Sequence, residues 1–392
     1  MNSKHILLGV CGGIAAYKAC EVVRLLKKAG HRVTVVMTKS ATEFVAPRTF
    51  QALSGEPVLT DLGQAMDGMV HVSTVRSANV FLIVPATANT LAKIACGLAD
   101  NLLTALVSAR GACPLVVAPA MNVQMWHNPA NARNIAQLEQ DGISVLLPNS
   151  GDLACGENGA GRMKEPAEIV DLLSDSWQAK ILADKKVLIT MGATFEPIDP
   201  VRGITNLSSG KMGVALARVC RAMGASVTVV AGQMCVPLPA GLHKITHTLS
   251  AQEMHQAVMQ DIEKQDIFIS AAAVADYKVK NASQQKIKKN KNLPTIELEE
   301  NPDILATVAH LKKPPFCVGF AAESENVIEY AQTKMKKKNI PMIVANQVAD
   351  AMGKDTTTIS IINAKEITEV PNADKYTAAK VIVERMVALL NG

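Results

Sequence analysis

The chain is organised around Met191–Gly213, MGATFEPIDPVRGITNLSSGKMG, which lies close to its midpoint. The apolar run Val187–Thr190 before it predicts a strand, and the apolar spacing of Val214–Met223 after it predicts a helix. Glycines and prolines between them predict a turn, and SSGK stands at the helix entrance. Such an entrance offers backbone N–H groups and a positive dipole end to an anion. The stretch predicts an α/β domain with an anion site, although an ordinary strand–helix connection has the same features.

The whole string resembles the signature of the phosphopantothenate–cysteine ligases. Arg202, Asn206 and Lys211 stand at the family's polar positions, while the first and third residues depart from its usual opening. The resemblance, which covers Lys185–Val387, implies that the carboxylate of 4′-phosphopantothenate attacks the α-phosphate of CTP, with Mg²⁺ present. The amine of cysteine then displaces CMP. The implied catalytic residues are Asn206, which orients the acyl intermediate, Arg202, which orients a phosphate, and Lys286, which binds substrate.

Residues after later strands carry the implied nucleotide site. The predicted strand Asp266–Ala272 places Asp276 beyond its carboxyl end, where a carboxylate suits magnesium or a ribose. Lys334 and Lys338 are one helical turn apart, so they share a face, which alone is typical of a solvated surface. By the resemblance these lysines bind the triphosphate and Asp276 binds Mg²⁺. The implied CTP-binding residues are Ser270, Ala271, Ala272, Asp276, Lys286, Asn301, Pro302, Asp303, Ile304, Phe320, Lys334 and Lys338.

The lysine-rich run Lys278–Lys291 has two further interpretations, a solvated loop and a nucleic-acid arm. It lacks the interleaved aromatic residues with which a single-strand binder stacks on bases. The net charge of +5 is modest. We therefore expect small anionic substrates and no nucleic-acid partner.

The first half opens with the predicted strand His5–Val10, a turn at Gly12 and Gly13, the predicted helix Ala15–Lys28 and the predicted strand His31–Met37. This succession predicts a doubly wound α/β sheet, in which ligands bind beyond the carboxyl ends of the strands. The glycines do not complete the dinucleotide fingerprint, and its trailing acid is absent. NAD is therefore disfavoured.

Three further segments of the first half combine polar residues with strand ends. The strand Phe81–Val84 leads into PATANT, and the strand Leu115–Ala118 leads into PAMNVQMW. The third segment, GDLACGENGAGRM, carries Cys155 among glycines and predicts a flap that closes over a site. Each feature alone fits a helix cap or an ordinary loop.

Together these segments resemble the flavin-dependent cysteine decarboxylases, specifically the phosphopantothenoylcysteine decarboxylases, over residues 4–175. The resemblance implies an FMN cofactor, which oxidises the substrate thiol so that carbon dioxide can leave and then reduces the ene-thiolate. His71 is implied as a base or orienter, Asn122 as the carboxylate's hydrogen-bond partner, and Cys155 as the donor of the final proton. Read singly, His71 and Cys155 are more often structural. The implied FMN-binding residues are Gly12, Gly13, Ile14, Ser40, Thr87, Ala88, Asn89 and Thr90.

Composition sets the outer bounds. The 392 residues are 48% hydrophobic but only 3% aromatic, which favours aliphatic cores and buried parallel strands. We predict two doubly wound, Rossmann-like or flavodoxin-like parallel-sheet domains: residues 1–183, the decarboxylase, and residues 184–392, the ligase. A helix is predicted over Glu165–Ile181. The eight cysteines form no disulfide or zinc pattern, and no apolar run suits a signal peptide or membrane helix, so we expect a cytoplasmic protein.

The two resemblances together imply the bifunctional enzymes of coenzyme A biosynthesis, and by family a homo-oligomer with trimeric decarboxylase and dimeric ligase contacts. One alternative is a peptidyl-cysteine decarboxylase or flavin prenyltransferase with an unrelated C-terminal domain. The signature in Met191–Gly213 argues against it. Another is a flavin-binding regulatory subunit without catalysis, against which His71, Asn122 and Cys155 argue.

Overall fold

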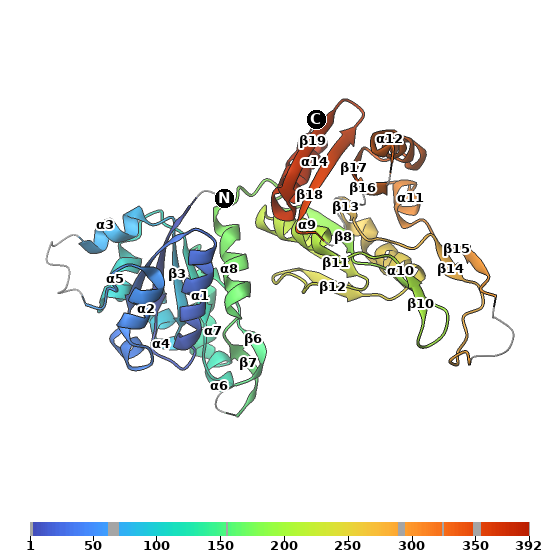
Figure 1. The fold of residues 1–392 in the computed structure, drawn as a ribbon. Helices are drawn as coiled ribbons and strands as arrows, with labels where there is room; N and C mark the ends of the chain where they lie inside the picture. The colour runs from blue at the N-terminus through green and yellow to red at the C-terminus, as the bar shows by residue number, and fades with distance from the viewer. Residues whose placement is uncertain are drawn as a thin grey trace. The chain divides into compact units, whose positions relative to one another are not determined.

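The computed structural model describes residues 3–61, 70–153, 156–288, 295–323, 325–347 and 354–391. The chain forms two compact units, Met1–Trp177 and Gln178–Gly392, which are described separately (Figure 1). The boundary predicted before Asp184 falls a few residues inside the second unit. Those residues bind that unit: Lys180 Nζ donates to the Ala222 carbonyl at 2.7 Å, and Leu182 N donates to the Met223 carbonyl at 2.9 Å.

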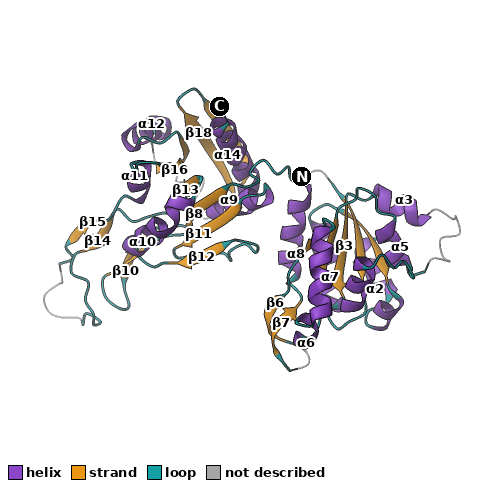
Figure 2. Ribbon diagram, turned by 180° about the vertical axis from the view of Figure 1, so that it is seen from behind, coloured by secondary structure: helices purple, strands orange, loops and turns teal. Residues whose placement is uncertain are grey.

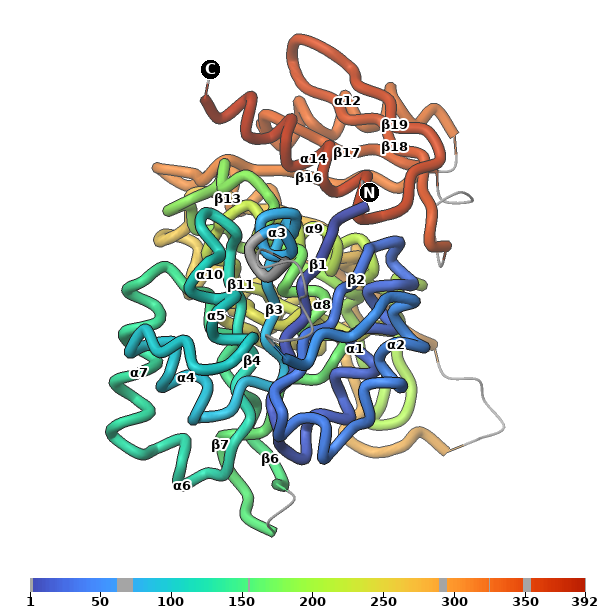
Figure 3. Tube along the Cα trace, turned by 90° about the vertical axis from the view of Figure 1, so that its left-hand side faces the viewer, coloured from blue at the N-terminus to red at the C-terminus, as the bar shows by residue number. Residues whose placement is uncertain are grey.

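The first unit is built on a parallel sheet in which β1 lies between β2 and β3 (Figure 3). Long aliphatic runs form these strands, as their composition predicts. The strand order across the sheet is β2 (Arg32–Met37), β1 (His5–Val10), β3 (Val80–Ala86), β4 (Leu115–Pro119) and β5 (Ser144–Val145).

Helices cover both faces of this sheet (Figure 2). The alternation of side chains along β1 separates the two cores: Ile6 and Leu8 pack on one face and Leu7 on the other. The Ile6 face is covered by α1 (Ala16–Lys28), α2 (Pro47–Ser54) and α8 (Pro166–Leu173), and the Leu7 face by α3 (Val70–Ser77), α4 (Ala88–Ala95), α5 (Leu102–Ser108) and α7 (Pro129–Gln140). The prediction of a doubly wound sheet is confirmed.

One local prediction in this unit was wrong. The helix predicted over Glu165–Ile181 ends at Leu173 and continues only as the 3₁₀ turn η3 (Ser174–Trp177). There Ser174 Oγ donates to the Asp171 carbonyl at 2.6 Å, which competes with regular helical pairing. The glycine-rich loop is largely an antiparallel hairpin, β6 (Asn149–Asp152) and β7 (Asn158–Arg162). The unit also contains η1 (Lys39–Glu43) and α6 (Val123–Trp126).

The second unit is built on a mixed sheet. The strands β8, β11, β12, β13, β16 and β17 pair in parallel. Strands β18 and β19 extend the sheet with antiparallel pairs, an addition that the sequence analysis did not predict. The strand order is β12 (Lys244–His247), β11 (Ser226–Ala231), β8 (Lys186–Met191), β13 (Ile267–Ser270), β16 (Phe316–Glu323), β17 (Met342–Gln347), β18 (Thr356–Asn363) and β19 (Ile367–Asp374).

Helices again lie on both faces of the sheet. One face carries α9 (Lys211–Ala222) and α14 (Lys375–Leu390), and the other carries α10 (Ala251–Asp261), α11 (Ile304–Ala309) and α12 (Val327–Lys338). Two short ribbons stand beside the sheet, β9 (Phe195–Pro197) with β10 (Gly203–Thr205) and β14 (Tyr277–Val279) with β15 (Leu298–Glu300), and α10 runs into η4 (Ile262–Lys264). Within the described residues, no helix is both long and apolar enough to cross a membrane.

The strand orders locate the ligand crevices. In chain order the first sheet reads 2-1-3-4-5, and the parallel part of the second reads 3-2-1-4-5-6. These are the flavodoxin-like and Rossmann orders, whose ligands bind where the strand order reverses. The reversals lie between β1 and β3 in the first unit and between β8 and β13 in the second.

Candidate functional site

The reversal in the first unit brings three predicted flavin-binding loops together. A Cβ added to Gly12 would lie 2.4 Å from Ser40 Cβ, so the chain after β1 runs directly against the chain after β2. A Cβ on Gly13 would meet only Thr87 Cγ2, at 3.9 Å, so the backbone here stays open beside β3. Ile14 is 64% exposed. An apolar side chain beside accessible backbone and hydroxyl groups fits a flat, partly polar ring such as a flavin.

The residues of PATANT divide into structural and accessible ones. The Thr87 hydroxyl caps α4 by accepting from Thr90 N at 3.4 Å. Thr90 is buried and accepts a hydrogen bond from Cys11 Sγ at 3.2 Å. Burial raises the pKa of the Cys11 thiol, although its contact with Thr90 acts in the opposite direction, so the thiol remains a neutral donor. Ala88 is also buried, which leaves Asn89 as the exposed side chain of this helix start.

Asn122 lies at the end of β4 and caps α6. Its Oδ1 accepts from Gln124 N at 2.7 Å, and its Nδ2 donates to a carboxylate oxygen of Glu157. Glu157 belongs to the β6–β7 hairpin, whose Gly161 carbonyl accepts from Met121 N at 3.1 Å. The hairpin is therefore attached to the Asn122 loop. Asn122 binds the Glu157 carboxylate in this arrangement, while its role toward a substrate carboxylate stays a prediction from the resemblance.

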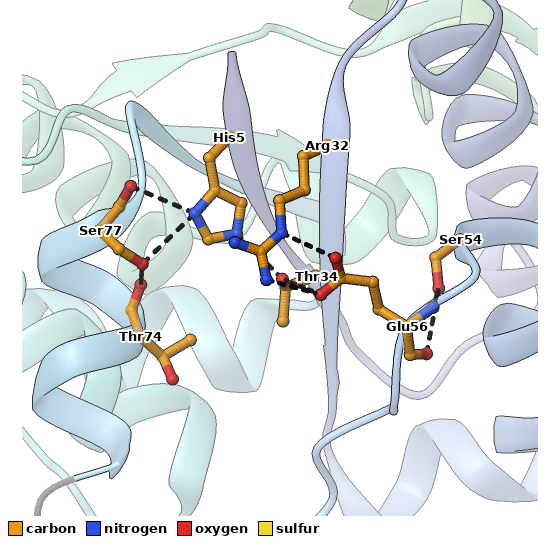
Figure 4. Close-up of polar contacts among 7 residues, drawn as sticks. All are labelled: His5, Arg32, Thr34, Ser54, Glu56, Thr74 and Ser77. Carbon is orange, nitrogen blue, oxygen red and sulfur yellow. Dashed lines mark hydrogen bonds and ion pairs between the residues drawn. The ribbon is translucent and has the colours of Figure 1, made fainter. Parts of the chain in front are cut away.

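His71 lies in the first turn of α3, and its side chain is outside the described part of the chain. The other end of α3 is anchored at Ser77, as Figure 4 shows. His5 Nδ1 of β1 lies 3.1 Å from the Ser77 carbonyl oxygen, and His5 Nε2 lies 2.9 Å from Thr34 Oγ1 of β2. Thr34 donates to Glu56 at 3.3 Å. This network, which the sequence analysis missed, holds α3, the helix that contains His71, to the sheet. Cys155 lies outside the described residues.

Beyond the carboxyl end of β13 and beside β16, the second unit holds a cavity of about 360 Å³. Nearly all residues of the predicted CTP site line it: Ser270, Ala272, Asp276, Asn301, Pro302, Asp303, Ile304, Phe320, Lys334 and Lys338. Ala271 lines a second cavity instead, of about 380 Å³. Sequence segments separated by more than sixty residues therefore meet at one place, as the strand order requires.

The charged side chains of the first cavity hold one another. Lys338 Nζ lies 2.8 Å from Asp303 Oδ2, and Asp303 also caps α11 by accepting from Ala306 N at 2.9 Å. Burial raises the pKa of the Asp303 carboxyl, but the Lys338 and backbone contacts outweigh it and leave that pKa below its usual value. Lys334 donates to the Phe320 carbonyl at 3.0 Å. Burial and the charge of Lys338 lower the pKa of Lys334, so a bound anion would be favourable here.

Asn301 carries the clearest sign of a missing partner. Its Nδ2 donates to the Ala275 carbonyl at 2.9 Å, and its backbone N donates to the Asp276 carbonyl at 2.9 Å. Its Oδ1 is buried and has no hydrogen-bond partner. An unpaired buried acceptor costs about 1–3 kcal/mol, so a ligand hydroxyl or amino group in the cavity would remove that cost.

The second cavity adjoins the first, because Ala272, Val274, Asp276, Phe320 and Lys334 line both. It is also lined by the N-terminal end of α9 and by residues that the sequence analysis did not assign: Asn346, Thr357, Ile359 and Lys375. Thr357 is only 2% exposed, and its Oγ1 has no hydrogen-bond partner. The β18 and α14 contributions were missed because no local motif marks them.

Lys211 and Lys375 add positive charge to the second cavity, beside the shared Lys334 and Asp276. Lys211 Nζ lies 2.6 Å from Asp355 Oδ1. Burial, together with the charge of Lys211, lowers the pKa of Lys375. Asn206 lines this cavity directly after β10, with its side chain exposed. An anion bound between the two lysines would relieve their repulsion.

Arg202 and Lys286 are described residues that line neither cavity. Arg202 Nε donates to Asp199 Oδ2 at 3.0 Å, and Arg202 Nη2 donates to the Ile287 carbonyl at 2.9 Å. Lys286, next to Ile287, is exposed. Asp199 was not predicted, although an aspartate three residues before an arginine in a turn is a readable signal.

No cluster of three or more metal-ligating side chains occurs among the described residues. Asp276 lines both cavities as a single carboxylate. Mg²⁺ is usually held by one or two carboxylates and substrate phosphates, so this carboxylate fits such an ion.

Comparison with known proteins bears on both units. Residues 182–390 match the family model described as DNA/pantothenate metabolism flavoprotein C-terminal domain, and residues 1–178 match the one described as Flavoprotein. The coenzyme A biosynthesis bifunctional protein CoaBC of Vibrio vulnificus is 47% identical over 354 residues, covering 89% of this chain and 88% of that protein. The chain belongs to the CoaBC family.

Other CoaBC proteins agree along the full length. The one from Bacillus subtilis is 41% identical over 398 residues, covering 99% of this chain and 98% of that protein. A crystal structure of the C-terminal domain of a CoaBC protein is 38% identical, covers 54% of this chain and 99% of its own, and has a TM-score of 0.47. CoaBC membership confirms the prediction of a bifunctional coenzyme A biosynthesis protein with a flavoprotein half.

Proposed function

We propose that this chain carries out two consecutive reactions of coenzyme A biosynthesis. Residues 184–392 join cysteine to 4′-phosphopantothenate with CTP, and residues 1–183 decarboxylate the phosphopantothenoylcysteine to 4′-phosphopantetheine with FMN. The observation that carries the proposal is the pair of adjoining cavities beyond the carboxyl end of β13, with lysines and an unpaired acceptor where a nucleotide and an acid must meet.

The first cavity takes CTP and the second takes the acid. Lys334 and Lys338 would face the triphosphate, Asp276 at the shared wall would hold Mg²⁺, and the unpaired Asn301 oxygen would accept from the ribose or the base. In the second cavity Lys211 and Lys375 face the phosphate of 4′-phosphopantothenate. The shared wall is where the acid's carboxylate and the α-phosphate of CTP approach each other.

Two displacements follow. A carboxylate oxygen attacks the α-phosphorus of CTP, the P–O bond to pyrophosphate breaks, and an acyl cytidylate forms. The amine of cysteine then attacks the acyl carbon, the bond to CMP breaks, and the amine loses a proton. Both steps concentrate negative charge, which lysines, Mg²⁺ and the N-terminus of α9 offset. Asn206 orients the acyl group and Lys286 assists its conversion.

The first unit fits FMN at the loops that contain Gly12, Gly13, Ser40 and Thr87. When bound, FMN supplies oxidation of the substrate thiol and the later reduction. Asn122 donates hydrogen bonds to the substrate carboxylate in place of Glu157. His71 moves or orients a proton near neutral pH. Cys155 supplies the last proton, since a thiol is a much stronger acid than a hydroxyl.

The test is a double dissociation on the purified full chain. Asn206→Ala should abolish formation of phosphopantothenoylcysteine from 4′-phosphopantothenate, cysteine and CTP, and leave decarboxylation of supplied phosphopantothenoylcysteine unchanged. Asn122→Ala should do the reverse. Loss of one well-placed donor costs about 100-fold or more. Equal losses of both activities in both variants would refute the assignment of sites.

Two features of the setting belong to the same proposal. The enzyme works in the cytoplasm, where its substrates and reduced thiols occur. It assembles as a homo-oligomer with trimeric decarboxylase and dimeric ligase contacts. Light scattering of the full chain and of each half tests the assembly, and a monomer at assay concentration would contradict it.

A further inference from the structure

We infer that Asp199 is a positioning residue that fixes the segment carrying Lys286 against the β9–β10 ribbon. The inference rests on the proposed ligase function, which needs Lys286 near the acyl intermediate. Asp199 lines neither cavity, so it acts through its hydrogen bonds with Arg202 and Ile287.

The Asp199 carboxylate is buried and fully used. Its side chain has no exposed surface. Oδ1 accepts from Val201 N at 2.9 Å and Arg202 N at 2.8 Å, and Oδ2 accepts from Arg202 Nε at 3.0 Å and Ile287 N at 3.1 Å. The Arg202 contact, with help from these amides, holds the pKa of the carboxyl well below its usual value despite burial. A buried charge with this many donors is a rigid anchor.

The anchor joins two segments more than eighty residues apart. On one side is the turn Asp199–Arg202 between β9 and β10. On the other is residues 283–288, where Ile287 is held at both polar atoms: its N donates to Asp199, and its carbonyl accepts from Arg202 Nη2 at 2.9 Å. A further bond runs from Ser283 N to the Ile198 carbonyl at 2.9 Å.

This geometry places the backbone of Lys286 while leaving its side chain exposed. The same turn leads through β10 into Asn206, and Thr205 Oγ1 at the end of β10 donates to the Thr194 carbonyl at 2.7 Å. One carboxylate therefore sets the starting points of both residues, Lys286 and Asn206, that the reaction needs. Holding a reacting group near its target lowers the entropic part of the barrier.

The experiment compares three full-length variants. Asp199→Asn keeps the shape and removes the charge. Ile287→Pro removes the N–H donor that links the lysine segment to Asp199, and its ring also restricts the backbone of residues 286 and 287. Asp261→Asn is the matched control, because it removes another carboxylate of the same unit, paired with Lys244 at 2.6 Å and outside both cavities.

Four quantities are measured for each variant: the ligase kcat, the KM for CTP, the amide hydrogen exchange of residues 283–288, and the midpoint of thermal unfolding. In Asp199→Asn and Ile287→Pro we expect kcat to fall ~10- to 100-fold, the KM for CTP to stay within about twofold, and exchange in this segment to accelerate. Asp261→Asn should match the wild type in kcat, in the KM for CTP and in the exchange of this segment. If Asp199→Asn does not fold, Ile287→Pro still tests the contact between Asp199 and the lysine segment.

Unchanged exchange over residues 283–288 in the folded variants, or faster exchange without loss of kcat, would overturn the inference. A fall in the unfolding midpoint with kcat per folded chain preserved would also overturn it, because that is the result of a merely structural role. A wild-type chain without ligase turnover would instead refute the proposed function, and the exchange data would still show whether Asp199 holds the segment.

Discussion

Substitution of Gly161 should uncouple the hairpin from the decarboxylase site. Gly161 has φ of +129°, and a Cβ added there would lie 2.4 Å from the Met121 carbonyl oxygen. Ordinary contacts begin at 3.4 Å, so Gly161→Ala forces the two segments apart by 3.4 − 2.4, about 1 Å. Met121 precedes Asn122, and a misplacement of about 1 Å typically costs about 100-fold in rate. We expect decarboxylation to fall by about that factor and ligation to stay unchanged.

Gly142→Ala is the matched control. Gly142 has φ of +76° but nothing within 4 Å of an added Cβ, so this variant has backbone strain without a collision. The strain costs about 1–2 kcal/mol, which lowers the unfolding midpoint of a unit this size by about 2–8 °C. Both variants should lose stability, but only Gly161→Ala should lose decarboxylase activity per folded chain. Wild-type decarboxylation by Gly161→Ala, or an equal loss in Gly142→Ala, would refute the reasoning.

Three further predictions follow from single groups. Lys334 must be charged to bind a triphosphate, and its pKa is lowered from 10.5. The affinity for CTP should therefore fall as the pH rises through that lowered pKa. Calorimetry of Lys334→Gln should show no such loss of affinity at alkaline pH. Thr357→Val should stabilise the free protein by about 1–3 kcal/mol, since it removes an unpaired buried hydroxyl. The same variant should raise the KM for 4′-phosphopantothenate. A KM unchanged from wild type would show that Thr357 does not bind this substrate. His5→Gln should loosen the end of α3 and lower the rate of decarboxylation ~10- to 100-fold, with ligation unchanged. Hydrogen exchange of the Ser77 amide measures the loosening. A wild-type rate of decarboxylation would contradict this role for the network.

Much of the sheet architecture follows directly from the sequence. The aliphatic run His5–Val10 matches the observed strand residue for residue, because a buried parallel strand must be apolar on both faces. The strand order then places Gly12, Thr87 and Asp276 at the two reversals. Motif residues at strand ends can therefore be assigned to a site before any coordinates exist.

The missed features depend on contacts that local patterns do not encode. Thr357 and Lys375 reach the second cavity only because β18 pairs antiparallel with β17, and nothing in their own segments announces a ligand. Glu157 matters because the glycine-rich segment folds back as a hairpin onto Asn122. The helix predicted to Ile181 stopped early because serine hydroxyls compete for carbonyl groups, an effect of side chains rather than of periodicity.

In the proposed function the two sites treat a carboxylate in opposite ways, and the charges that surround it differ accordingly. The ligase cavities are lined by lysines, because a carboxylate that attacks a phosphate must approach an already negative group. In the first unit the carboxylate partner is the neutral amide of Asn122, which already binds the Glu157 carboxylate there. A cation at that position would stabilise the substrate carboxylate more than the departing carbon dioxide, and so would raise the barrier to decarboxylation. An amide orients the group through hydrogen bonds whose strength falls as its charge moves into the rest of the substrate.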